Sequence, residues 1–186
     1  MTTKAEFAKN FPGGAAPPEL EKLLDFQETG PGFEGYAEGF GLYYDDKGLF
    51  KTWSTEPSFL DALIPFAQAT GGGSVYALWS DGKTTDASSM PVVIFGDEGG
   101  THVVAGDLKR FLQLLTFGPE PMVDHDRVTY YKPKDFEPRE GLAAYVAWLQ
   151  KEWDLGPIND AKAVVKAAQD KHQAAYVAWF KQFAAD

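Results

Sequence analysis

Residues 75–79 read Val-Tyr-Ala-Leu-Trp and follow closely on the glycine triplet of residues 71–73. Both alternating sets of side chains in this segment are apolar, which predicts a central strand over 74–80. Two more apolar runs predict strands over 90–96 and 101–105, and the Gly-Asp-Glu-Gly-Gly sequence between them is typical of a turn. We therefore expect three adjacent antiparallel strands in the middle of the chain.

A helix is predicted directly after these strands. Asp107 is a favourable N-cap. The apolar residues that follow recur at the i, i+3, i+4 and i+7 positions of one helical face: Leu108, Phe111, Leu112 and Leu115. Gly118 and Pro119 end the pattern. The sequence thus predicts a helix over 107–117 that packs on the sheet.

Three more elements are predicted before the strands. A proline pair opens a short amphipathic helix over 19–26. Alternating residues over 36–44, an Asp-Asp-Lys-Gly turn and the run 49–53 predict a β-hairpin. Apolar residues at helical spacing over 56–69 predict a helix that ends or bends at Pro65.

The hexapeptide Ala-Ala-Tyr-Val-Ala-Trp occurs twice near the end of the chain, at 143–148 and at 174–179. Both copies lie in segments of helical periodicity, 139–153 and 160–184. Their apolar faces predict a C-terminal helical hairpin packed on the sheet domain, with the tryptophan of each copy largely buried. A partner-binding arm is the alternative, although exposed apolar patches of this size are rare on soluble monomers.

Composition limits the class of protein. With 186 residues, 44% apolar and 15% aromatic, the chain can bury one sizeable core. It contains no cysteine, which excludes a disulfide scaffold and thiolate chemistry. The start lacks an apolar signal core, and no run approaches the ~20 apolar residues that span a bilayer. We expect a soluble, cytoplasmic protein that does not associate with membranes.

The net charge of −10 is unevenly distributed. Residues 19–107 hold 15 Asp or Glu and four Lys, a net of −11, whereas residues 121–186 hold ten acids and nine bases. Such a field repels nucleic acid and anionic lipid, and it raises the encounter rate with a basic protein. The charge therefore favours a basic protein partner over nucleic acid, with ordinary solubility charge as the alternative interpretation.

No segment carries a complete catalytic or ligand-binding motif. Residues 82–85 resemble the end of a P-loop, but Ala77 stands where the leading glycine is required, and residues 86–91 are typical of a loop. Residues 124–126 read Asp-His-Asp, yet adjacent side chains of an extended segment point in opposite directions and seldom meet at one ion.

Two histidines invite a catalytic interpretation that the sequence does not support. His102 on a strand and His172 on an apolar helical stripe could be combined with Ser88 or Ser89, but no Gly-x-Ser-x-Gly elbow is present. The turn at 97–100 lacks the alternating ligands and closing Glu of an EF-hand loop. We expect no catalytic residues, no cofactor and no metal ion.

The order of short motifs along residues 17–120 is distinctive. They are Pro17-Pro18-Glu19-Leu20-Glu21-Lys22-Leu23-Leu24, Ile64-Pro65-Phe66-Ala67, Tyr76-Ala77-Leu78-Trp79, Pro91-Val92-Val93, Gly96-Asp97-Glu98-Gly99-Gly100, Val103-Val104-Ala105 and the helical segment from Asp107 to Leu115. This order resembles the SUKH superfamily, which includes a fungal cell-wall-synthesis regulator family and many bacterial immunity proteins of toxin systems. Ala69-Thr70 departs from the acidic residue common before the glycines, and the chain after residue 121 has no counterpart in the family.

The resemblance implies a fold and a function. The predicted class is α+β: a mostly antiparallel central sheet with packed helices and a C-terminal helical hairpin. Residues 1–120 would form the SUKH-like domain, and residues 121–186 a helical extension packed on it. The implied role is non-catalytic: an immunity protein that binds a bacterial toxin effector, often a nuclease, and neutralises it.

Acids on turns and sheet loops are the predicted partner-binding residues, because rigid sheets often present recognition residues on loops. They are Asp45, Asp46, Asp81, Asp86, Asp97 and Glu98. One alternative is an intracellular regulator or scaffold that binds an endogenous partner through the helical tail. Another is a small carboxylate-dependent enzyme that uses Asp45 with Asp46, although adjacent acids in a turn are usually exposed to solvent.

Overall fold

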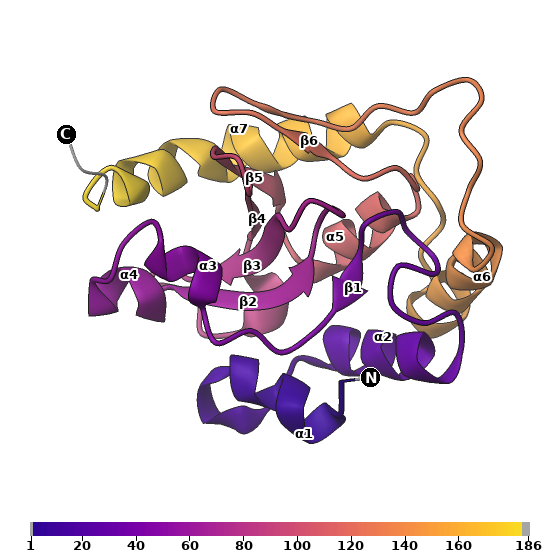
Figure 1. Cartoon of the computed structure of the whole chain (residues 1–186), viewed down its shortest axis with the longest axis horizontal. Helices are drawn as coiled ribbons and strands as arrows, with labels where there is room; N and C mark the ends of the chain where they lie inside the picture. Colours follow the sequence, from indigo (N-terminus) through magenta and orange to yellow (C-terminus); the bar gives the residue numbers. More distant parts are fainter. Residues whose placement is uncertain (1, 184–186) are drawn as a thin grey trace.

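The computed structural model describes residues 2–183 and shows an α+β fold built around one antiparallel sheet (Figure 1), which confirms the predicted class. The strands are β1 (Gly41–Leu42), β2 (Leu63–Gln68), β3 (Val75–Trp79), β4 (Val92–Phe95), β5 (Thr101–Ala105), β6 (Met122–Val123) and β7 (Val128–Thr129). The α-helices are α1 (Lys4–Phe7), α2 (Pro18–Thr29), α3 (Gly48–Lys51), α4 (Pro57–Asp61), α5 (Leu108–Leu115), α6 (Leu142–Trp153) and α7 (Ala161–Phe180). Short 3-10 helices are η1 (Ala8–Asn10), η2 (Pro12–Gly14) and η3 (Ala87–Ser89).

The main sheet is a meander in the order β1-β2-β3-β4-β5, and each neighbouring pair is antiparallel. β3 occupies the centre, as its apolar sequence predicts, and Val75 pairs with Phe95 of β4. The turn at 96–100 joins β4 to β5. The three strands predicted in the middle of the chain are therefore confirmed as adjacent and antiparallel. β6 and β7 form a separate hairpin.

Both faces of the sheet are buried because successive side chains of a strand point to opposite faces. Tyr76 and Leu78 of β3 belong to one hydrophobic core, whereas Ala77 and Trp79 belong to another. Figure 1 shows that α7 runs along one side of the sheet, with α1 and α2 on the opposite side. Helices thus cover the sheet, and the loops that join the strands lie at its two ends.

Phe111 of α5 lies at the centre of the first core and is fully buried. Its ring centroid lies 4.8 Å from that of Tyr76 and 5.4 Å from that of Phe66, both in edge-to-face geometry. α2 contributes the apolar residues Leu20, Leu23 and Leu24. This helix confirms the prediction over 19–26 and continues to Thr29.

Asp107 caps α5, as its position predicts. Its Oδ1 accepts a hydrogen bond from the backbone N–H of Arg110 at 2.8 Å. We expect Asp107→Ala to lower the free energy of unfolding by about 1 kcal/mol, because that N–H loses its partner. Urea unfolding measures the difference. Asp107→Asn keeps an acceptor and should cost much less, and an alanine variant with the wild-type midpoint would contradict the capping role.

The predicted hairpin over 36–53 is wrong. β1 has two residues and pairs with β2 instead of with 49–53. Lys47 adopts a left-handed conformation with φ of 65°, and α3 begins directly after it. The physical reason is burial of Phe50 in the second core, where its ring centroid lies 4.7 Å from that of Phe95. A helical turn at this point brings the side chain to the sheet.

The predicted helix over 56–69 is wrong beyond its first turn. α4 ends at Asp61, and the apolar residues after it form β2 between β1 and β3. Strands buried on both faces have continuous apolar sequences, which resemble those of a buried helix. Pro65 has no backbone N–H and lies where the register of β2 shifts against β3, a position at which a strand tolerates proline.

The helices predicted over 139–153 and 160–184 are confirmed as α6 and α7, apart from residue 184, which lies outside the described residues. Both helices pack on the sheet domain, as predicted. The hairpin itself needs a correction, because the two helices make few contacts with each other. α6 packs beside α2, where the ring centroids of Trp148 and Phe26 are 5.4 Å apart. α7 packs along β5, and Figure 1 shows the two helices in different places around the sheet.

Tyrosine is the buried residue of each hexapeptide copy. Tyr145 and Tyr176 are fully buried, whereas Trp148 and Trp179 remain partly exposed. The hydroxyl of Tyr145 donates a hydrogen bond to the carbonyl oxygen of Leu112 at 2.7 Å. The apolar faces of both helices are therefore used within the chain, as the intramolecular interpretation predicts. Trp148 and Trp179 keep only a minor part of their surface exposed and pack against the two cores, in line with the prediction.

Side chains of α7 also form hydrogen bonds with the backbone of the edge strand β5. The backbone N–H of Val103 donates a hydrogen bond to the side-chain oxygen of Gln173 at 2.9 Å. The side-chain NH₂ of Gln169 donates to the carbonyl oxygen of Val103 at 3.2 Å. These bonds satisfy outward-facing backbone groups of the edge strand. Among residues 2–183, no helix has both the length and the apolar character needed to cross a membrane.

Candidate functional site

Asp81 and Asp86 lie in the loop of residues 80–91, which connects β3 to β4. Two backbone N–H groups donate hydrogen bonds to Asp81 Oδ1 at 2.8 and 3.2 Å, and chiefly the one from Lys83 lowers the pKa of this carboxyl. The hydroxyl of Ser89 donates to Asp86 at 2.8 Å and is the main cause of the lowered pKa of Asp86. Both carboxylates are exposed, ionised and oriented by their turns.

Asp45 and Asp46 follow β1 and differ in their surroundings. The half-buried Asp45 accepts hydrogen bonds from the hydroxyl of Tyr43 at 2.9 Å and from the N–H of Gly48 at 3.1 Å. Asp46 is exposed, and its carboxylate lies 3.9 Å from the ammonium of Lys51. In the described structure the two carboxyl groups share no hydrogen bond. Their arrangement therefore gives no support to an acid–base pair at this position.

The strand register divides the six predicted acids between the two ends of the sheet. Leu63 pairs with Trp79, so β2 begins at the end where β3 finishes. Because β1 is antiparallel to β2, the chain after β1 heads toward this same end. Four of the acids lie toward it: Asp45, Asp46, Asp81 and Asp86. The remaining two, Asp97 and Glu98, lie at the opposite end, in the turn between β4 and β5.

That opposite end consists of the glycine loop, residues 70–74, and the turn of residues 96–100. Asp97 joins the two segments: its Oδ1 accepts a hydrogen bond from the hydroxyl of Ser74 at 2.6 Å. The backbone N–H of Asp97 donates to the same hydroxyl oxygen at 3.2 Å. A Cβ added at Gly72 would lie 2.8 Å from Asp97 Oδ2, so a side chain there would displace the carboxylate from its present position.

Two more glutamates reach this end from distant parts of the chain. Glu120, after α5, accepts a hydrogen bond from the N–H of Gly71 at 2.8 Å. The backbone N–H of Glu120 donates to a carboxylate oxygen of Glu38 at 3.4 Å. Together with the two predicted acids they form a group that we name the glycine-loop acids: Glu38, Asp97, Glu98 and Glu120. Sequence reasoning missed Glu38 and Glu120 as members because no local motif connects them to the loop.

The two ends of the sheet differ in how far nearby basic groups compensate the charge of their acids. Among the residues that the structure describes, no basic nitrogen lies within 4.0 Å of a carboxylate oxygen of the glycine-loop acids. At the other end Asp46 faces Lys51, and the charge of Lys83 contributes to the lowered pKa of Asp81. The glycine-loop acids are thus the less compensated group.

The other sequence motifs do not combine into a catalytic site, although the turn of residues 124–126 packs against Gly99 and Gly100 of the turn that carries Asp97 and Glu98. Residues 82–85 are a largely exposed part of the loop between β3 and β4, and residues 124–126 form the exposed turn between β6 and β7. The ring of the buried His102 donates to a backbone carbonyl of that turn at 2.7 Å. The hydroxyl of Ser88 donates to Glu19 at 2.8 Å. Across residues 2–183, no three acidic or histidine side chains lie close enough to hold a metal ion.

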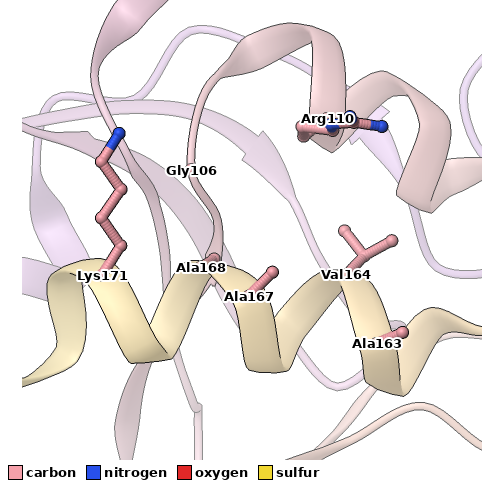
Figure 2. Close-up of a pocket in the computed structure, with 7 residues that line it drawn as sticks. All are labelled: Gly106, Arg110, Ala163, Val164, Ala167, Ala168 and Lys171. Atoms are coloured by element: carbon pink, nitrogen blue, oxygen red, sulfur yellow. The ribbon is translucent and has the colours of Figure 1, made fainter.

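A cleft of about 320 Å³ lies between α5 and α7 (Figure 2). Small side chains and two basic residues line it: Gly106, Arg110, Ala163, Val164, Ala167, Ala168 and Lys171. Figure 2 shows Arg110 on α5 across the gap from the alanines of α7. No sequence motif marks this cleft, because its two helices become neighbours only through the docking of α7 on the sheet.

Comparisons of the chain with protein-family models, with curated proteins and with solved structures found no match. An α+β architecture alone does not define a function, because one fold can carry many activities. The function has to be inferred from the geometry and charge of the described residues.

Proposed function

We propose that the chain is a non-catalytic protein-binding domain that recognises a basic protein through its glycine-loop acids. The observation that carries this proposal is the gathering of four carboxylates, from three separate segments, around one exposed loop, without a compensating ion pair among the described residues. Uncompensated charge of one sign steers an oppositely charged partner and raises its association rate.

The acids are also held in place before a partner arrives. Asp97 is bound by Ser74, and Glu120 is bound by the N–H of Gly71. Side chains that are already ordered lose less conformational entropy on binding. Residues 71–73 are exposed and have no side chains, so a partner can approach the carboxylates closely. These features support recognition at this end of the sheet.

The resemblance of residues 17–120 to the SUKH superfamily adds the class of partner to the proposal. The partner is a bacterial toxin effector, and the chain is the immunity protein that binds and neutralises it. Toxin nucleases have cationic surfaces for their anionic substrates, which an acidic protein can occupy. The alternative role of a scaffold that binds through the helical tail has less support, because the apolar faces of α6 and α7 are packed within the chain.

The test compares two triple variants that remove equal charge from the two ends of the sheet. One combines Glu38→Gln, Asp97→Asn and Glu98→Gln, and the control combines Asp46→Asn, Asp81→Asn and Asp86→Asn. Basic proteins captured from the native lysate are identified by mass spectrometry, and their association is then followed by stopped flow across ionic strengths. We expect the glycine-loop variant to associate about tenfold or more slowly at low salt, with a flatter salt dependence and a less affected dissociation rate.

The control variant should associate at nearly the wild-type rate. Because asparagine can accept the same turn hydrogen bonds as aspartate, the 80–91 loop should keep its conformation. Equal rates and equal salt slopes for wild type and the glycine-loop variant would mean that these acids serve only solubility. Slower association of the control variant alone would move the binding surface to the 80–91 end of the sheet.

A further inference from the structure

The cleft between α5 and α7 combines an apolar wall with basic side chains (Figure 2). Ala163 and Ala167 are exposed on α7, and their small side chains leave the space toward α5 unfilled. Ala168 is buried beneath them, and Gly106 adds no side chain to the wall. The cleft can therefore accept a small apolar group against a helix that is already packed on the sheet.

The two basic residues of the cleft have no acidic partner in the described structure. The guanidinium of Arg110 donates to the neutral side chain of Gln113 at 2.8 Å. Among residues 2–183, no acceptor or carboxylate lies in bonding distance of the ammonium of Lys171. Two uncompensated cations beside one apolar wall attract an anion that carries an apolar part.

A buried polar atom without a partner lies next to the same wall. The Nε2 atom of His172 has no hydrogen-bond partner in the described structure. It lies close to Gly106: a Cβ atom built on that glycine would be 3.8 Å from it. Burial, and secondarily the charge of Lys171, lowers the pKa of His172, so its ring is neutral near pH 7. The neutral ring itself neither attracts nor repels an anion, whereas the carboxylates of Asp81 and Asp107, which act to raise the pKa of His172, are the negative charges on this side of the cleft.

We propose that this cleft binds a small amphipathic carboxylate, at a site separate from the glycine-loop acids. The carboxylate pairs with Arg110, Lys171 adds positive charge at the other end of the cleft, and the apolar part lies against Ala163 and Ala167. A guanidinium suits this role because it can donate two parallel hydrogen bonds to a carboxylate. The volume of about 320 Å³ is near the lower end of ligand pockets, which start at about 300 Å³, so the ligand is small.

A second cleft, of about 450 Å³, flanks α7 on its other side but is a weaker candidate. Lys166 there is bound by Asp170 at 2.6 Å, and Arg127 lies 3.9 Å from Asp124. These pairs reduce the positive charge available to an anion. Lys162 lines this second cleft and is exposed on the same helix. It provides a charge-matched control position outside the proposed site.

Hexanoate is a suitable probe, followed by NMR of the ¹⁵N-labelled full chain. We expect saturable shifts of the amide signals of Gly106, Ala167 and Lys171, with a dissociation constant on the order of 1 mM. Acetate, which lacks the apolar chain, should bind more weakly. Hexylamine, which has the same chain and the opposite charge, should not shift these signals.

Single substitutions test whether hexanoate binds in this cleft. Arg110→Gln and Lys171→Gln should each weaken hexanoate binding by about threefold to tenfold, while the control Lys162→Gln should leave it unchanged. Ala167→Leu keeps all charges, fills the cleft from an exposed position and should abolish the shifts. The proposal is overturned if hexanoate produces no saturable shift, if hexylamine binds equally well, or if the Arg110 and Lys171 variants bind hexanoate as wild type does.

Discussion

Removal of residues 121–186 is expected to lower the free energy of unfolding by several kcal/mol. The truncation removes Tyr145 and Tyr176, both fully buried, and uncovers the side of the sheet under α7. Truncation of one large buried aromatic residue alone costs about 3–5 kcal/mol. The whole stability of a domain is about 5–15 kcal/mol, so the shortened chain should be at the limit of folding. Guanidinium unfolding with circular dichroism measures the effect.

Point variants keep this prediction testable if the truncated chain does not fold. Tyr145→Ala and Tyr176→Ala should each lower the unfolding midpoint strongly, whereas Lys181→Ala, at an exposed position, should change stability by no more than about 0.5 kcal/mol. The same experiment tests the division of the chain at residue 120, which stays a prediction. A truncated chain with the melting temperature of the intact one would show that the tail is an independent arm.

Phe111→Ala is expected to lower the free energy of unfolding by about 3–5 kcal/mol. The ring is fully buried, and three aromatic side chains surround it: Phe40, Phe66 and Tyr76, at centroid distances of 5.9, 5.4 and 4.8 Å. A cavity in this cluster loses dispersion contacts on several sides at once. In a chain of this size the melting temperature should fall by about 10 °C, which calorimetry can measure.

Tyr131→Ala is the control for this experiment, because Tyr131 is 62% exposed and its truncation leaves no cavity. Its stability should stay within about 0.5 kcal/mol of wild type. Phe111→Leu should fall between the two, since leucine refills part of the volume. A Phe111→Ala protein with an unchanged midpoint would mean that the packing around α5 is not what stabilises the first core.

The central strands could be predicted from the sequence because their signals are local. Apolar residues on both faces of β3, and the turn between β4 and β5, identify them without knowledge of the rest of the chain. β1 and β2 could not be predicted in this way. β1 has only two residues and is defined by its pairing with Leu63–Gln68. Phe50 lies in a helical turn because its side chain packs in a core that forms from distant segments.

In the candidate site, too, only the residues that lie on a local motif could be predicted. Asp97 and Glu98 could be identified because the turn that carries them is a sequence motif. Glu38 and Glu120 join them only through hydrogen bonds to other parts of the chain. The sequence also could not show that Asp45 and Asp46 lie toward the other end of the sheet, because that placement depends on the direction in which β1 pairs.

The two glutamines of α7 have a consequence for how the molecule behaves at high concentration. An exposed edge strand offers its free backbone groups to any other chain, which is a common route to aggregation and amyloid growth. Gln169 and Gln173 occupy those groups on Val103, so a helix stands where another strand would dock. At the far edge β1 is only two residues long, a poor template for intermolecular pairing. Both edges of the sheet are therefore protected against the addition of a strand from another molecule.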